Sequence, residues 1–207
     1  MKPSFIYLAS QSPRRAQLLE QLGVRFELLL ADASEDAESL EVQRPNEAPL
    51  AYVKRVTALK LEAALALARA KRRGLPSAPV LCSDTTVALG RTIYGKPESD
   101  AHARAMLAEL AGHTHRVMTA VAVGTARKRS LVVQTSLVTF APLTPAQIRA
   151  YVATGEPRGK AGAYGIQGGA AQFIEHISGS YTGIMGLPLY ETGQLLAQFG
   201  VRPSGTI

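Results

Sequence analysis

The sequence predicts an α/β fold in which a mixed central β-sheet is flanked by helices. Short apolar runs of strand-like composition alternate along the chain with longer segments that have amphipathic, helical spacing. Hydrophobic residues make up 46% of the 207 residues and charged residues 19%, enough for a sizeable core. No repeat or flexible linker interrupts this alternation, so we expect a single domain over residues 1–207, with any two lobes tightly joined.

The first elements can be placed from their boundary residues. An apolar strand over residues 5–8 leads into a helix, for which Ser12 suits the N-cap and Pro13 the first helical position. Gly23 follows the last apolar residue of that helix and should end it. Residues 24–30 then form a second strand.

The later elements follow the same signals, with Thr144 and Pro145 as another cap and first helical residue. In chain order we expect a polar loop over 32–47, a helix over 50–72, a buried strand over 79–89, a short hairpin strand within 90–95, a helix over 99–110, long strands over 115–123 and 130–140, a helix over 144–153, a glycine-rich loop over 155–169, a strand near 172–177, a glycine-rich turn over 179–186 and a last helix opened by Pro188.

Composition narrows the class of protein. The 23 basic and 16 acidic residues give a net charge of +7, which suits small anionic substrates. Aromatic residues are only 6% of the chain, without tryptophan, which argues against a stable nucleic-acid complex. No apolar run reaches the length of a membrane span or a signal peptide. The lone Cys82 excludes an internal disulfide and favours a cytoplasmic location, with the thiol buried in a strand.

The segment Leu8-Ala9-Ser10-Gln11-Ser12-Pro13-Arg14-Arg15 is the most informative stretch of the chain. It places Arg14 and Arg15 in the first helical turn, where a cation opposes the helix dipole. An arriving anion, typically phosphate, would neutralise both arginines beside the free backbone N–H groups. The alternative is a solvated helix start with both side chains in water.

Asp84 is the strongest single candidate for chemistry. It interrupts the otherwise apolar strand Val80–Val87, where a carboxylate is costly unless it is paired, hydrogen-bonded or bound to a metal. The alternative is an aspartate at a strand end that caps a turn. Three other charged residues have weaker signals. The local sequence of Glu35 is typical of a solvated loop charge, and that of Lys60 is typical of a surface lysine. Lys96 lies in a Gly-Lys-Pro turn, where the proline restrains its backbone.

Two further features carry little specificity. The glycine-rich segment 160–169 would let backbone approach a ligand, but it lacks the spacing of a dinucleotide fingerprint or a P-loop. His113 and His115 have no carboxylate or cysteine cluster near them in sequence, so we expect surface or turn histidines rather than metal ligands.

Taken together, these segments resemble the Maf family of nucleoside triphosphate pyrophosphatases. The matching pieces occur in family order over nearly the whole chain: residues 8–15, Ser83-Asp84-Thr85, Gly95-Lys96-Pro97, residues 163–168 and Gly186-Leu187-Pro188-Leu189.

The resemblance implies hydrolysis of a nucleoside triphosphate to its monophosphate and pyrophosphate with a divalent cation, Mg²⁺ by preference. It also implies a fold related to the inosine triphosphatases, with two lobes around a cleft, and a homodimer as the usual state. Residue by residue, Asp84 matches the catalytic acid, and Glu35 is the expected metal ligand. The remaining matches are to substrate-binding residues: Ser10, Arg14, Arg15, Lys60 and Lys96.

The resemblance also indicates which nucleobase the substrate carries. In the branch that acts on 7-methyl-GTP, the positions of Arg14, Thr85 and Gln167 hold an aromatic residue, Gln and Glu. This chain instead matches the branch that acts on dTTP and UTP. A glutamine amide has both a donor and an acceptor, which suits the O4/N3–H edge of thymine or uracil. The alternatives are the same chemistry on 7-methyl-GTP, and a non-enzymatic anion-binding regulator of cell division.

Overall fold

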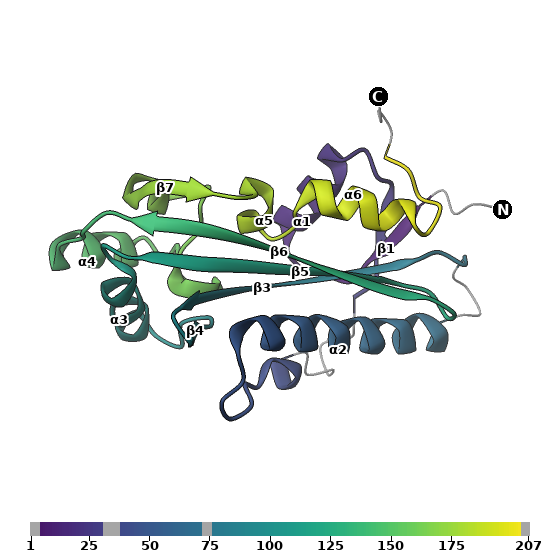
Figure 1. Ribbon diagram of the computed structural model, residues 1–207, viewed down its shortest axis with the longest axis horizontal. Coiled ribbons are helices and arrows are strands. Elements are labelled where there is room, and N and C mark those ends of the chain that lie inside the picture. Colours follow the sequence, from purple (N-terminus) through teal and green to yellow (C-terminus); the bar gives the residue numbers. More distant parts are fainter. Residues whose placement is uncertain (1–4, 31–37, 72–75, 204–207) are drawn as a thin grey trace. The chain divides into compact units, whose positions relative to one another are not determined.

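The computed structural model describes residues 5–30, 38–71 and 76–203. Its strands lie close to the expected ranges: β1 (Ile6–Leu8), β2 (Phe26–Leu28), β3 (Val80–Leu89), β4 (Thr92–Tyr94), β5 (Thr114–Gly124), β6 (Arg129–Phe140) and β7 (Ile174–Ser178) (Figure 1). The α-helices are α1 (Pro13–Gln21), α2 (Pro49–Ala70), α3 (Asp100–Leu110), α4 (Pro145–Ala153), α5 (Tyr181–Met185) and α6 (Leu189–Ala197).

The described strands form a mixed sheet, which confirms the predicted fold class. Their hydrogen-bonded order is β2-β1-β3-β5-β6-β7, and β4 pairs with β3 outside this path. The strand β1 is parallel to both β2 and β3. The pairs β3–β4 and β6–β7 are antiparallel. Parallel neighbours need a crossover, and α1 and α2 are the helices that the chain places between them.

The chain divides into two compact units. The first unit comprises the residues up to Asp84, residues 119–134 and the residues from Gly186 onward, and the second comprises residues 85–118 and 135–185. Both are therefore built from segments that are distant in the sequence. The strand β3 passes from the first unit into the second directly after Asp84.

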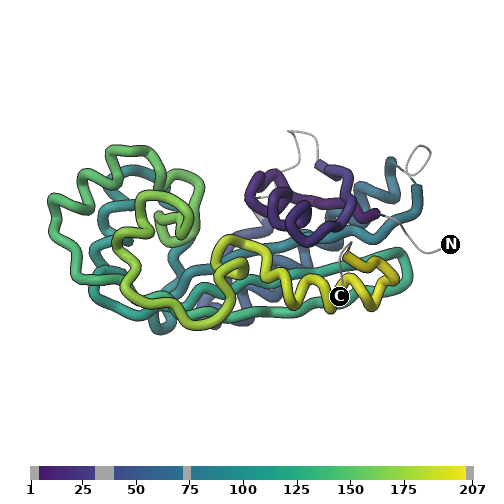
Figure 2. Tube along the Cα trace, turned by 90° about the horizontal axis from the view of Figure 1, so that it is seen from above, coloured from purple at the N-terminus to yellow at the C-terminus, as the bar shows by residue number. Residues whose placement is uncertain are grey.

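In the first unit, helices cover both faces of the sheet (Figure 1). The helix α2 contributes Leu61, Ala64 and Leu65 to a buried cluster that includes Val80 and Cys82 of β3. Helices α1 and α6 lie side by side on the other face, although they come from opposite ends of the chain (Figures 1 and 2). No helix among the described residues is long and apolar enough to cross a membrane.

In the second unit, the core is aromatic and contains a buried polar pair. His115, Phe140 and Tyr164 pack edge to face, with ring centroids 4.8–5.5 Å apart. The His115 Nε2 atom lies 2.8 Å from the Tyr164 hydroxyl, and His115 is only 1% exposed. The expectation of a surface or turn histidine is therefore wrong for His115. Its ring packs against two aromatic rings, and its Nε2 atom has the tyrosine hydroxyl as a hydrogen-bond partner.

Four details differ from the sequence-based expectations, all in glycine-rich or polar segments. The expected loops contain 3₁₀ turns at Glu38–Glu41, Ala161–Ala163 and Gly169–Phe173, and α5 forms inside the expected turn over 179–186. The strand β7 begins at Ile174. Ser12 is the N-cap of α1 but its side chain makes no capping hydrogen bond. Thr144 does cap α4, within a reciprocal capping box with Gln147.

The burial of His115 predicts an acid-sensitive contribution to stability. Burial lowers the pKa of His115 from 6.5 to about 4. As the pH falls from 6.5 towards 4, His115 is therefore protonated in the unfolded state but not in the folded state. This difference lowers the free energy of unfolding by about 3 kcal/mol over that range. We expect His115→Gln to lose less stability than the wild type over this range. Urea unfolding at pH 7, 5.5 and 4 measures it, and parallel profiles for the two proteins would contradict the assignment.

Candidate active site

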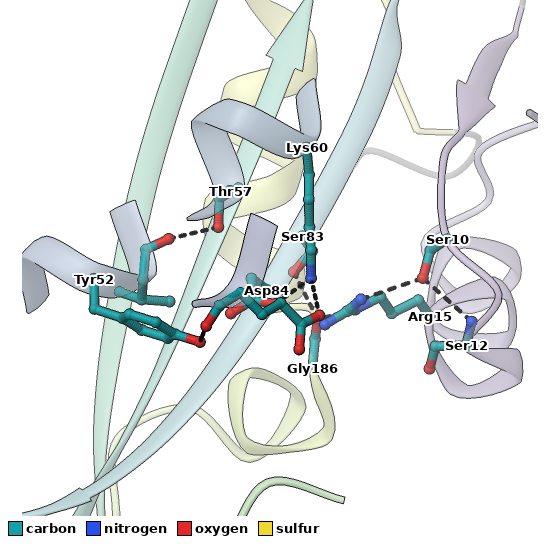
Figure 3. A network of polar contacts seen from close by, with 11 residues as sticks. Ser10, Ser12, Arg15, Tyr52, Thr57, Lys60, Ser83, Asp84 and Gly186 are labelled. Carbon is teal, nitrogen blue, oxygen red and sulfur yellow. Dashed lines mark hydrogen bonds and ion pairs between the residues drawn. The ribbon is translucent and has the colours of Figure 1, made fainter. Parts of the chain in front are cut away.

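The turn between β1 and α1 folds the second of its two arginines back onto a serine. The Ser10 Oγ atom accepts a hydrogen bond from the Ser12 backbone N–H at 3.2 Å and another from the Arg15 Nη1 atom at 3.2 Å (Figure 3). Since Ser10 Oγ takes the Ser12 N–H, the turn is stabilised without a side-chain cap from Ser12 itself. The guanidinium of Arg15 is thereby fixed over the end of β1.

A single main-chain carbonyl connects this turn to β3. The Gly186 carbonyl oxygen accepts hydrogen bonds from Arg15 Nε at 2.9 Å and from Ser83 Oγ at 2.9 Å (Figure 3). Gly186 is buried and has φ +117°, in the region that favours glycine. The segments around residues 10–15, 83 and 186 thus meet at one acceptor in the first unit.

Asp84 lies beside this junction, and its carboxylate is paired. The residue is 9% exposed, and its Oδ1 atom accepts a hydrogen bond from Lys60 Nζ at 2.6 Å. The same ammonium donates to Glu41 Oε1 at 2.7 Å. Lys60 extends from α2 towards the sheet, as Figure 3 shows, so the alternative of a surface lysine is wrong. One ammonium therefore holds two carboxylates.

Burial and neighbouring charges act in opposite directions on the two basic groups of the site, Lys60 and Arg15. Burial alone would lower the pKa of Lys60, but the charges and hydrogen bonds of Asp84 and Glu41 outweigh it and hold that pKa above its ordinary value. Burial lowers the pKa of Arg15, and the Asp84 carboxylate partly offsets this effect. A guanidinium stays protonated in proteins, so both basic groups are cationic at neutral pH.

Arg14 differs from Arg15 in its surroundings. Its side chain is half-buried and makes no hydrogen bond or ion pair with the part of the chain that the structure describes. Of the two adjacent arginines, Arg15 is thus built into the first unit, whereas Arg14 retains donors for another group. Five guanidinium N–H bonds of fixed geometry suit a phosphate or a carbonyl edge.

Glu41 is a site residue that the sequence analysis missed. It lies in the same acidic segment as Glu35, and only the 3₁₀ turn over Glu38–Glu41 brings it to Lys60. Glu35, the expected metal ligand, lies outside the described residues. The one sequence signal for Glu41 was its membership of an acidic segment just before the helix that carries Lys60.

Three expected substrate-binding residues belong to the second unit. Thr85 is partly buried on β3, Lys96 is exposed after β4, and Gln167 is exposed in the glycine-rich loop. The Gly162 N–H donates to the Gly95 carbonyl at 3.1 Å, which ties the loop that carries Gln167 to the turn that carries Lys96.

The same loop is held by a carboxylate that sequence reasoning also missed. Glu156 accepts hydrogen bonds from the Gly169 N–H at 2.7 Å and from the Tyr151 hydroxyl at 2.9 Å. A Cβ on Gly168 would lie 2.1 Å from Glu156 Oε1, so this position leaves no room for a side chain. Gly168, directly after Gln167, therefore serves a close approach of backbone to a carboxylate.

The donor set of the first unit suits a hard divalent cation bound with a substrate. No group of three His, Cys, Asp or Glu side chains that could hold a metal occurs among the described residues. Asp84 and Glu41 do converge on one cation, the Lys60 ammonium. Mg²⁺ is typically held by one or two carboxylates, with water and substrate phosphates completing its shell.

Comparison with known proteins identifies the family. A family model described as "Maf-like protein" matches residues 5–199, which include every described residue of the site above. The chain belongs to the Maf-like protein family.

Curated relatives of this Maf-like chain are similar over almost their whole length. A protein of Albidiferax ferrireducens named dTTP/UTP pyrophosphatase is 68% identical over 96% of this chain and 98% of its own. Proteins of the same name from Polaromonas sp. and Ralstonia nicotianae are 63% and 58% identical, over 96% and 95% of this chain and 97% and 94% of their own. Among solved structures, the Staphylococcus aureus Ham1 protein aligns with 66% of this chain and 71% of its own at 16% identity and a TM-score of 0.42.

Removing the shared cation of the Maf-like site should expose the repulsion between its two carboxylates. We expect Lys60→Met to destabilise the protein by about 1–3 kcal/mol at pH 7, since it leaves Asp84 and Glu41 without their common donor. Denaturant unfolding at pH 7 measures it.

The matched control is Lys54→Met, which removes an exposed lysine from the same helix. This variant should stay within about 0.5 kcal/mol of the wild type at pH 7. Equal losses in the two variants would mean that the Lys60 pair contributes nothing specific.

Proposed function

We propose that this chain is a metal-dependent nucleoside triphosphate pyrophosphatase that acts preferentially on dTTP and UTP. The observation that carries the proposal is the paired carboxylate of Asp84, with Lys60 hydrogen-bonded to it and Arg15 beside it in the first unit. The names of relatives at 58–68% identity support the same activity and the same bases.

The proposed reaction is attack of water on the α-phosphorus. The new bond joins the water oxygen to the α-phosphorus, the bond from that phosphorus to the oxygen bridging it to the β-phosphorus breaks, and pyrophosphate leaves with the bond's electrons. We assign to Asp84 the orientation of this water and the acceptance of its proton. Ser10 and Arg15 bind the phosphate chain, and Lys60 and Lys96 stabilise the charge that develops on the leaving group.

A divalent cation, Mg²⁺ in this proposal, lowers the pKa of a bound water and neutralises phosphate charge when it is present. Such help matters because a free aspartate, with a pKa of about 3.9, is a weak base at pH 7. We keep Glu35 as the proposed ligand for this cation together with Asp84. The two carboxylates on Lys60 support a site of this chemistry, since hard oxygen donors suit Mg²⁺.

For base selection we propose Arg14, Thr85 and Gln167. The exposed Gln167 amide can donate to a pyrimidine O4 and accept from N3–H, which matches thymine and uracil alike. The hydrogen bond from the Gly169 N–H to Glu156 supports this role, because a side chain that recognises the base needs a fixed backbone.

The proposal extends to the state of the whole chain. Both units would serve one Maf-like domain over residues 1–207, because the family match runs through both. A homodimer in the cytoplasm is the proposed working form. The cytoplasm is supported by the single cysteine, Cys82, since a chain with one cysteine has no internal disulfide to maintain.

The test of the activity is pyrophosphate release from the purified protein with Mg²⁺. We expect turnover of dTTP and UTP to exceed that of CTP, dGTP and 7-methyl-GTP by about tenfold or more, the discrimination that one matched pair of hydrogen bonds provides. Selective turnover of 7-methyl-GTP would overturn the assigned bases but keep the reaction. If no nucleotide releases pyrophosphate, the chain is a binding protein rather than an enzyme.

The test of the catalytic assignment is Asp84→Asn. The amide oxygen can still accept the Lys60 hydrogen bond, so we expect the variant to fold and to bind nucleotide. Turnover should fall by about 10²–10⁴-fold, because the variant cannot accept a proton from water. Nucleotide binding by calorimetry and initial rates of pyrophosphate release measure the two effects, and near-wild-type turnover would refute the role of Asp84.

A further inference from the structure

Glu41 places a negative charge where the proposed reaction needs a positive one. Its Oε1 atom lies 2.7 Å from Lys60 Nζ, and the Asp84 carboxylate takes a second hydrogen bond from the same group at 2.6 Å. We infer that Glu41 competes with the phosphate groups of the substrate for Lys60 and so sets how tightly nucleotide binds. This inference rests on the proposed function, in which Lys60 contacts phosphate.

The competition follows from the chemistry of the two anions. A carboxylate and a phosphate both accept charge-assisted hydrogen bonds from an ammonium, and Lys60 has three N–H donors of which two are taken. A phosphate that approaches Lys60 also meets the charge of Glu41 in a site that is mostly shielded from water, since the Lys60 and Glu41 side chains are 20% and 26% exposed. Like charges in such a place repel more strongly than in water.

The backbone that carries Glu41 is anchored separately from its carboxylate. The Tyr52 hydroxyl donates to the Glu41 carbonyl at 2.8 Å, and Arg55 Nη2 donates to the Val42 carbonyl at 2.9 Å. Arg55 is itself held by both oxygens of Glu47, at 2.6 Å each, and this contact lowers the pKa of Glu47 to about 2. The Glu41 side chain can therefore rotate away from Lys60 while the chain around it keeps its anchors on α2.

Glu41 and Asp84 hold the same ammonium from elements of different kinds. Asp84 is part of the long strand β3, and its side chain is one methylene shorter than that of Glu41. Glu41 ends a four-residue 3₁₀ turn outside the sheet, so its withdrawal from Lys60 leaves the strand pairing intact. Of the two anions on Lys60, Glu41 is the one that can yield its place to phosphate.

The experiment is a double-mutant cycle on binding. We would measure the affinity of α,β-imido-UTP, which cannot be cleaved at the reacting bond, by calorimetry with Mg²⁺ present. Glu41→Gln should bind the analogue about 3–10-fold more tightly, the effect of removing one competing ion pair. In a Lys60→Met background the same substitution should change affinity by less than about twofold. Lys60→Gln, which keeps a hydrogen-bond donor, replaces Lys60→Met if that variant does not fold.

Glu62→Gln is the control for net charge. Glu62 lies on α2 two residues from Lys60 and pairs with Arg129 at the surface, so its substitution makes the same change of net charge outside the site. It should leave the affinity within about twofold of the wild type. Tyr52→Phe loses one anchor of the Glu41 backbone and should tighten binding in the same direction as Glu41→Gln, by a smaller factor.

The outcomes separate the inference from the function on which it rests. Unchanged or weaker binding by Glu41→Gln, or equal tightening with and without Lys60, would overturn the competition while leaving the proposed function intact. If the wild type does not bind the analogue, or binds it no better than Lys60→Met does, the assignment of phosphate to Lys60 fails and the inference fails with it.

Discussion

The burial of one carboxylate constrains the architecture of the first unit. Asp84 interrupts an apolar strand, and an ionised carboxylate in such a place requires a nearby cation. Lys60 supplies this cation, which requires α2 to lie against the sheet at the correct register. The apolar face of α2, with Leu61 and Leu65, packs under β3 and fixes that register. Packing and charge pairing thus depend on the same helix position, and a shift of α2 would break both.

A second feature of the site is that its two basic side chains have different hydrogen-bond partners. Arg15 is occupied by Ser10 and the Gly186 carbonyl, whereas Lys60 is occupied by two carboxylates. Each cation is thus neutralised or hydrogen-bonded in a distinct way, which spreads the positive charge over the site. An extended anion such as a triphosphate chain has several charged groups and matches spread charge better than a single cation would.

The sequence predicted the fold well because its signals were local. Pro145 and Thr144 define a helix start, Gly23 defines a helix end, and periodic apolar residues define the strands, and all of these depend on neighbours in the chain. The burial of Asp84 was also predictable, since its strand begins and ends with apolar residues. Lys60 became a site residue only through the family resemblance, because a lysine between two leucines has the local pattern of a surface position.

What the sequence could not predict depends on long-range contacts. Glu41 meets Lys60 across 19 positions, and Glu156 meets Gly169 across 13, and neither segment has a periodic pattern that would orient it. The burial of His115 depends on a tyrosine 49 positions away. In each case a polar side chain finds its partner only when the sheet and its helices are assembled, so no window of sequence contains the signal.

The junction at Gly186 has a consequence for how such a site varies among related chains. Its acceptor is a main-chain carbonyl, which every amino acid possesses, so no replacement of a side chain at that position removes the oxygen itself. The torsion angle of φ +117° favours glycine at that position. A scan that truncates side chains one by one would therefore assign the contact wholly to its donors, Arg15 and Ser83, and would overlook the backbone that joins them. An amide-to-ester replacement would not remove this acceptor but would weaken it. The contribution of the junction is therefore tested by changing the main chain rather than a side chain.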